Sequence, residues 1–257
     1  MSKQTSLFSI AQTLQHHDLF AFNSRTFAAM FNLNAVQAAR LLTRMENEGL
    51  VERVERGKYL LLGLTPEKVL ANPLFIGSQL VTPGYISFWS ALHFYSFTEQ
   101  VPRTVFIATT RKKPSLTYRG TPYQFVQIAP DQFFGYQREM VGELPIVVAD
   151  EAKALLDSLF RPQYAGGVGE VAKALLAARD QLDVETLVDY ANRMGSRSLG
   201  SRLGYLLQQI GIEAEGLEIS HGPVNLEPDQ PRGGPFDATW QVYANLSPEA
   251  LFPEGVG

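Results

Sequence analysis

The chain has 257 residues, no cysteine, and 22 basic against 26 acidic side chains, which gives a formal net charge of −4. This is a globular composition with enough length for two domains, and it argues against a uniformly basic nucleic-acid binder. Disulfides and thiolate sites are excluded, and the four histidines lack the i, i+4 spacing of a helical zinc site. We therefore expect no cofactor and no metal.

Charge is unevenly distributed along the chain. Residues 1–130 carry 13 basic and 7 acidic side chains, a net of +6, whereas residues 131–257 carry 9 and 19, a net of −10. The two halves therefore suit different partners. No segment has a signal-peptide core or the ~20 apolar residues of a membrane helix, so a cytoplasmic protein without a membrane partner is expected.

The first 62 residues are predicted to form three helices and a β-hairpin. Apolar residues at helical spacing indicate a first helix that ends near His17. Asn23 or Ser24 can cap a short second helix. Asn32 and Asn34 then supply turn and N-cap chemistry before a third helix. The predicted order is helix, helix, tight turn, helix.

The third helix is predicted to be amphipathic. Its apolar face is formed by Ala38, Leu41, Leu42 and Met45. Gly49 supplies a left-handed helix stop, and residues 51–53 can pair with residues 58–62 across a turn that contains Gly57. A polar, partly basic helix face and a basic hairpin are therefore left free.

This order of elements is typical of a winged helix-turn-helix domain, whose third helix enters the DNA major groove while the hairpin reaches phosphates. Arg40 can hydrogen-bond guanine and Gln37 adenine, and the hairpin cations suit phosphates. The candidate residues for binding double-stranded DNA are Asn34, Gln37, Arg40, Arg44, Arg53, Arg56 and Lys58. The alternative is a structural three-helix module or a protein–protein adaptor.

The predicted domains are a DNA-binding domain at 1–62, a proline-punctuated connector at 63–82 and an α+β domain at 83–257. In the last domain, Tyr85 to Tyr95 is predicted to be an aromatic core helix. The predicted strands cover residues 105–108, 123–128, 144–148 and 238–243, and a helix and a run of three helices follow the third of them. The predicted fold class is therefore α+β.

Two patterns in this region resemble sites, but they have simpler explanations. Asp150, Glu151 and Asp157 could be mistaken for catalytic carboxylates, yet the first two suit the positive end of a helix. The glycines at 166, 167 and 169 lack the Lys-Ser/Thr ending of a phosphate loop, so they indicate a turn and a helix start.

Three segments resemble the AbiEi antitoxin family of phage-defence regulators: "TPGYISFWSALHFYSFTEQVPRTVFIAT", "VVADEAKALLDSLFRPQYAGGVGEVAKAL" and "SRLGYLLQQIG". The resemblance implies a type IV toxin-antitoxin module, in which an N-terminal winged helix represses the module's own promoter. It also implies a C-terminal domain that opposes a neighbouring nucleotidyltransferase-like toxin without a stable complex. No compact motif marks antitoxic residues.

Two other classes remain open. A nucleotidyltransferase is suggested by "MGSRSLGSR", but no pair of carboxylates one residue apart follows either Gly-Ser, so we expect that the protein is not an enzyme. The main alternative is a winged-helix transcriptional regulator that senses a small molecule through its C-terminal domain.

Overall fold

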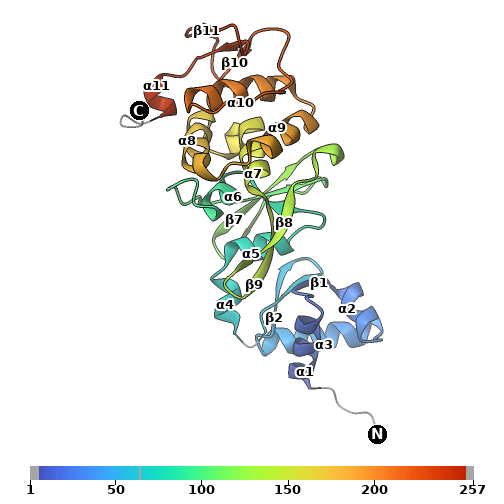
Figure 1. The fold of residues 1–257 in the computed structure, drawn as a ribbon. Coiled ribbons are helices and arrows are strands. Elements are labelled where there is room, and N and C mark those ends of the chain that lie inside the picture. The colour runs from blue at the N-terminus through green and yellow to red at the C-terminus, as the bar shows by residue number, and fades with distance from the viewer. Residues whose placement is uncertain (1–5, 64, 253–257) are drawn as a thin grey trace. The chain divides into compact units, whose positions relative to one another are not determined.

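The structure is a computed structural model that describes residues 6–63 and 65–252 (Figure 1). Helices and strands are both abundant, so the predicted α+β class is confirmed. The chain divides into two compact units. Unit 1 contains the chain up to Thr82 together with Tyr118–Gly120 and Met140–Ile146, and unit 2 contains the remainder from Pro83 on. The predicted connector, residues 63–82, falls within unit 1.

Unit 1 contains the three helices and the hairpin expected from the sequence, together with one strand and two short helices that were not predicted. Its elements are α1 (Leu7–His16), β1 (Ala21–Asn23), α2 (Ser24–Met30), α3 (Ala35–Asn47), β2 (Val51–Glu55), β3 (Lys58–Leu61), α4 (Pro66–Leu70) and α5 (Pro73–Gln79). Asn23 caps α2, because its side chain accepts a hydrogen bond from the Thr26 N–H at 2.8 Å. Pro66 and Pro73 each occupy the first turn of their helix, where a missing N–H costs nothing.

A three-stranded sheet in the order β1-β3-β2 packs against the helices α1, α2 and α3. Both pairings are antiparallel, and Gly57 turns the chain between β2 and β3 with a φ of 73°. Gly49 ends α3 with a φ of 70°, a left-handed conformation that glycine adopts without steric cost. The Leu50 N–H then donates to the Met45 carbonyl at 2.9 Å, so the chain folds back from α3 into β2.

The core of this cluster follows the helical spacing of the sequence. Its fully buried side chains are Leu14, Phe27, Leu42, Met45 and Leu60. Leu41, which was predicted on the same face as Leu42, is only half-buried. One face of α3 is therefore fixed in the core, and the opposite face is left in solvent.

The larger sheet has six strands in the order β6-β7-β5-β4-β9-β8. These are β4 (Tyr85–Ile86), β5 (Val105–Thr109), β6 (Leu116–Tyr118), β7 (Thr121–Gln127), β8 (Tyr136–Val141) and β9 (Leu144–Ala149). Strand β4 runs antiparallel to β5 and parallel to β9, and β5 runs parallel to β7, so the sheet is mixed.

Helices make up most of the rest of unit 2. They are α6 (Phe88–Phe94), α7 (Glu151–Phe160), α8 (Val168–Ala178), α9 (Val184–Arg193), α10 (Arg197–Gln209) and α11 (Pro248–Leu251), with short 3-10 turns at Pro130–Gln132, Pro162–Tyr164 and Arg179–Gln181 (Figure 1). A small sheet of β10 (Val224–Asn225), β12 (Val242–Tyr243) and β11 (Phe236–Asp237) follows α10. Asp150 caps α7, as expected for an acidic side chain at the positive end of a helix. Gly167 directly precedes α8, as expected for glycines at a turn and a helix start.

Three predictions for unit 2 need correction. Tyr85 and Ile86 form β4 instead of opening a helix, because they pair with Ala108 and Ile107 of β5. Strands β6, β8, β10 and β11 were not predicted. The late strand expected at residues 238–243 contracts to Val242–Tyr243.

No helix in residues 6–63 or 65–252 has the length and apolar character needed to cross a membrane.

Candidate nucleic-acid interface and a neighbouring pocket

The solvent face of α3 carries the residues that were predicted to read DNA. Gln37, Arg40 and Arg44 are exposed, and they lie three and four residues apart, on one side of the helix. Val36 is 60% exposed beside them. Sequence reasoning missed Val36, although an exposed apolar side chain at a helix start suits a thymine methyl group.

Asn34 and Gln37 are engaged with each other at the start of α3. Asn34 Oδ1 accepts from the Gln37 N–H at 2.9 Å, and Gln37 Oε1 accepts from the Asn34 N–H at 3.0 Å. This reciprocal pair is a capping box, which satisfies two helix donors that would otherwise lack partners. Bidentate reading of adenine by Gln37 would require its Oε1 to leave Asn34, whereas its amide N–H groups remain available.

The hairpin presents two of its three predicted cations to solvent. Arg53 and Arg56 are exposed, and Arg53 Nε donates to the Glu55 carbonyl at 3.3 Å. Lys58 is half-buried, and its ammonium donates to the Leu80 carbonyl, so part of its donor capacity is used within unit 1. Arg25 is a further exposed cation that the sequence analysis missed. The sequence could have indicated it, because Arg25 comes two residues after the N-cap Asn23 and therefore lies in the first turn of α2.

An acidic residue of the hairpin is neutralised within unit 1. Arg119 donates from Nε and Nη2 to the Glu52 carboxylate, with the shortest distance 2.7 Å. Burial by itself raises the pKa of Glu52, but the hydrogen bonds from Arg119 and Tyr118 outweigh it and leave this pKa below its ordinary value. The ion pair cancels one negative charge next to Arg53, the basic residue of β2.

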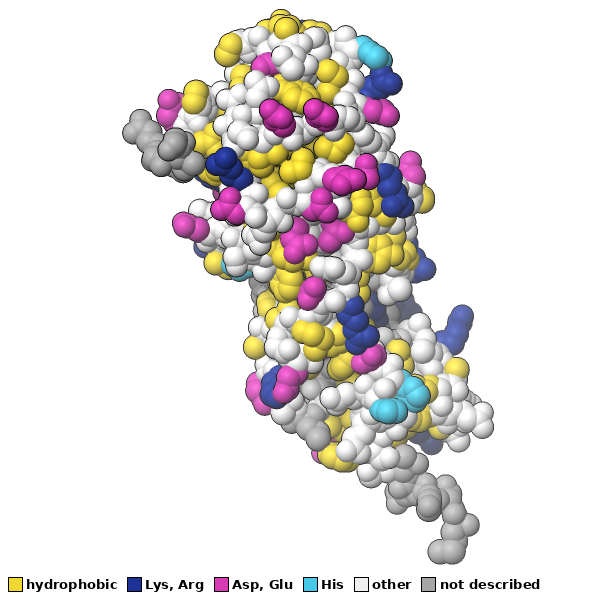
Figure 2. Space-filling view, viewed as in Figure 1, with side chains coloured by type: hydrophobic (Ala, Val, Ile, Leu, Met, Phe, Trp, Pro, Cys, Tyr) yellow, Lys and Arg dark blue, Asp and Glu magenta, His cyan; other side chains and the backbone are white. Residues whose placement is uncertain are grey.

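Unit 2 presents a different surface. Acidic side chains gather over the part of unit 2 visible in Figure 2. Helix α9 contributes exposed Glu185 and Asp189, and Asp183 is exposed at its N-cap. This face would repel a phosphate backbone, so the cations of unit 1 are the better candidates for contact with nucleic acid.

The carboxylate of Asp157 belongs to a buried network. Lys153 and Asp157, one turn apart on α7, form an ion pair with side-chain exposures of 0% and 2%. Tyr85 and Ser87 donate their hydroxyls to Asp157 Oδ2 at 3.1 and 2.7 Å. Burial, with the neighbouring Asp157 charge, raises the pKa of Tyr85 well above its ordinary value. Because both charges are paired and inaccessible to a substrate, the network is a structural part of the core.

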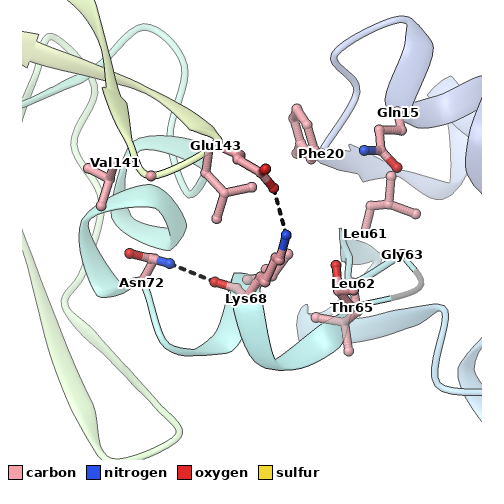
Figure 3. Close-up of a pocket in the computed structure, with 13 residues that line it drawn as sticks. Gln15, Phe20, Leu61, Leu62, Gly63, Thr65, Lys68, Asn72, Val141 and Glu143 are labelled. Atoms are coloured by element: carbon pink, nitrogen blue, oxygen red, sulfur yellow. Dashed lines mark hydrogen bonds and ion pairs between the residues drawn. The ribbon is translucent and has the colours of Figure 1, made fainter.

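Unit 1 also contains a pocket of about 330 Å³, which Figure 3 shows. Its apolar lining includes Phe20, Leu61, Leu62, Val69, Val141 and Leu144, and its polar lining includes Gln15, Thr65, Lys68, Asn72 and Glu143. Lys68 Nζ and Glu143 Oε2 meet at 2.7 Å across it. The volume lies at the lower end of the ~300–1,000 Å³ range of small-molecule sites. In the described part of the chain, no group of three or more His, Cys, Asp or Glu side chains is placed to hold a metal ion.

Together these elements define an α+β protein with a cluster of helices and a β-hairpin at its N-terminal end. No family model matches the sequence. No curated protein matches it either. Among solved structures, the chain is similar to that of the RV2827C protein from Mycobacterium tuberculosis, with a TM-score of 0.53 and 13% sequence identity. The match covers 93% of this chain and 92% of the other, and at this identity it shows a shared fold alone.

Proposed function

We propose that the first 62 residues form a winged helix-turn-helix domain that binds double-stranded DNA at the chain's own promoter. The observation that carries this proposal is the two-sided character of α3. Ala38, Leu42 and Met45 are at most 1% exposed, while Arg40 and Arg44 lie on the solvent side of the same helix. A helix that is anchored by one face and basic on the other suits the major groove.

The hairpin supplies the second half of the proposed interface. Arg53 in β2 and Arg56 in the β2–β3 turn are both exposed, where long cations can reach phosphates. In this proposal Arg40 and Arg44 read base edges, while Arg53 and Arg56 hold the backbone. Gln37 serves first as a cap, and its amide N–H groups can still donate to a base.

We further propose that the protein is the antitoxin and autorepressor of a type IV toxin-antitoxin module, and that it is not an enzyme. This part is supported by the resemblance of three sequence segments to AbiEi antitoxins. Its partner would be a neighbouring nucleotidyltransferase-like toxin, which it opposes without a stable complex. The acidic surface of unit 2 differs in charge from α3 and the hairpin, which is compatible with two separate activities.

Two experiments test these proposals separately. An electrophoretic mobility shift with the full chain should show tighter binding to its own promoter than to a scrambled duplex of equal length. Co-expression with the adjacent open reading frame should restore growth if that frame encodes the toxin. Equal affinity for both duplexes would reject the repressor, and an adjacent gene that is not toxic would reject the antitoxin.

A second candidate function is a transcriptional regulator that responds to a small molecule. The pocket of unit 1 favours this second candidate, because part of its lining belongs to the hairpin. Leu61 is the last residue of strand β3 and Leu62 follows it, and both line the pocket. The two candidates share the DNA-binding surface and differ in whether a ligand changes operator affinity.

A further inference from the structure

We propose that the pocket of unit 1 binds a small zwitterion with an apolar body, of the class of the larger aliphatic or aromatic amino acids. Three properties of the pocket lead to this ligand class: its apolar floor, its one pair of opposite charges and its polar rim. The part of the proposal that concerns operator affinity rests on the proposed DNA-binding function, whereas ligand binding itself does not.

The floor of the pocket is apolar and already fixed by the fold. Phe20, Leu61, Leu62 and Val69 have exposures of 8%, 1%, 6% and 5%. Phe20 is held edge-on against Phe75, with ring centroids 5.2 Å apart. A branched aliphatic or aromatic group placed on this floor would gain apolar burial without first ordering the side chains beneath it.

The charges at the pocket are one cation and one anion in contact. Lys68 and Glu143 keep side-chain exposures of 55% and 81%, and an exposed pair of this kind stabilises a fold little. A ligand with a carboxylate and an ammonium can insert between them and exchange one weak pair for two. A ligand with a single charge would replace the Lys68–Glu143 pair by one pair of similar strength and gain nothing from the exchange.

The rim offers further hydrogen-bonding groups. Figure 3 shows the Gln15 amide and Thr65 at one side of the pocket and Asn72 at the other. Asn72 Nδ2 donates to the Lys68 carbonyl at 2.6 Å, and Asn72 makes no side-chain cap to α5, although it precedes that helix. These groups can orient a small polar head over the apolar floor.

The backbone of the pocket floor is hydrogen-bonded to elements of the proposed DNA reader. The Leu62 N–H donates to the Leu50 carbonyl at 2.9 Å, and the Leu61 N–H donates to the Phe20 carbonyl at 2.7 Å. Leu50 in turn follows the end of α3. A ligand that packs on this floor would therefore stabilise the support of α3 and β3, and by linkage the operator and the ligand would alter each other's affinity equally.

Isothermal titration calorimetry with the full chain tests the site. L-leucine and L-phenylalanine should bind, whereas 3-methylbutylamine and 4-methylpentanoate, which keep the apolar body of leucine but carry one charge each, should bind about fivefold more weakly because each forms one ion pair fewer. The double variant Lys68→Gln, Glu143→Gln should weaken leucine binding about fivefold, because it removes the net gain of one partly exposed ion pair on binding. The matched controls Lys112→Gln and Glu99→Gln remove exposed charges outside the pocket and should bind as the unmodified chain does.

Absence of heat with both amino acids, or equal affinity for leucine and its single-charge analogues, would overturn the site, and neither result depends on a variant. Mobility shifts with and without leucine test the regulatory part. An operator affinity that leucine leaves unchanged would overturn regulation while the calorimetry still supports the site. Loss of specific operator binding altogether would instead reject the proposed function.

Discussion

Asn34 and Gln37 cap α3 reciprocally: the side-chain oxygen of each accepts a hydrogen bond from the other's backbone N–H, at 2.9 and 3.0 Å. This relationship fixes the first turn of the helix that presents Arg40 and Arg44. It also gives Gln37 a structural role that restricts how it can contact a base. The cap therefore connects the stability of unit 1 to the geometry of its proposed reading face.

Replacing the cap should destabilise the protein measurably. Asn34→Ala removes the acceptor for the Gln37 N–H, and the loss of such an N-cap lowers the free energy of unfolding by about 1 kcal/mol. Urea unfolding followed by circular dichroism checks this. Asn47→Ala, an exposed change at the last residue of the same helix, is the control and should not lower stability. Equal stability of the two variants would show that the cap does not contribute.

The two groups of arginines should differ in how they affect DNA binding. Arg40→Ala should cost about 1–3 kcal/mol on the operator and relax preference at one base position. Arg56→Ala should weaken operator and scrambled DNA alike and reduce the slope of log affinity against log salt by about 1. Titrations at several salt concentrations measure both effects. Arg103→Ala, an exposed arginine of unit 2, is the control. Identical effects of Arg40→Ala on both duplexes would remove its base-reading role.

The Glu52–Arg119 pair should make stability depend on pH on the acidic side. The folded pKa of Glu52 lies below its ordinary value of 4.5. The stabilisation of the folded state by ionised Glu52 is therefore complete above pH 4.5, and it is lost as the pH falls through the lowered pKa of Glu52. Arg119→Gln should reduce this acid-side loss. Thermal melts from pH 6 downward check the prediction, and high salt should diminish the difference because both side chains are partly exposed, at 54% and 27%. A larger acid-side loss in the variant would contradict the assignment.

Breaking the buried ion pair of α7 should have a much larger effect. Lys153→Met leaves the Asp157 charge unpaired in the core, which costs about 3–5 kcal/mol. Lys173→Met is a matched control, because Lys173 pairs with Glu170 on α8 but keeps 43% exposure. That change should cost about 1 kcal/mol or less. Similar unfolding free energies for the two variants would show that the Lys153–Asp157 pair is not the closed network described above.

Strong periodicity explains which elements could be predicted from sequence. The third helix has apolar residues every three or four positions, an N-cap signal and a terminal glycine, and the structure places α3 at Ala35–Asn47. Strand β8 carries no such pattern. It is an edge strand whose residues Tyr136–Val141 are mostly exposed, so neither face is buried and no alternation of apolar and polar residues arises. Tyr85 and Ile86 were misassigned because two residues are too few to show a period of two.

The candidate sites depend more heavily on tertiary structure. The exposed arginines of α3 and the hairpin were foreseen, because polar faces follow from helix and strand geometry. Lys153 and Asp157 have the i, i+4 spacing of an ordinary surface pair, and only the packing of unit 2 buries them. The pocket of unit 1 is lined by residues from several separate segments, among them α4 and the β8–β9 turn. No local sequence pattern predicts that these segments lie together.

The central claim is that α3 and the hairpin together bind the promoter, and the double variant Arg40→Ala, Arg56→Ala tests it most directly. Both side chains are exposed, so the variant should fold as the unmodified chain does. In a mobility shift with the chain's own promoter, we expect specific binding to weaken by more than tenfold, as the loss of a base contact and a phosphate contact requires. An unchanged affinity for the promoter in this folded variant would contradict the account.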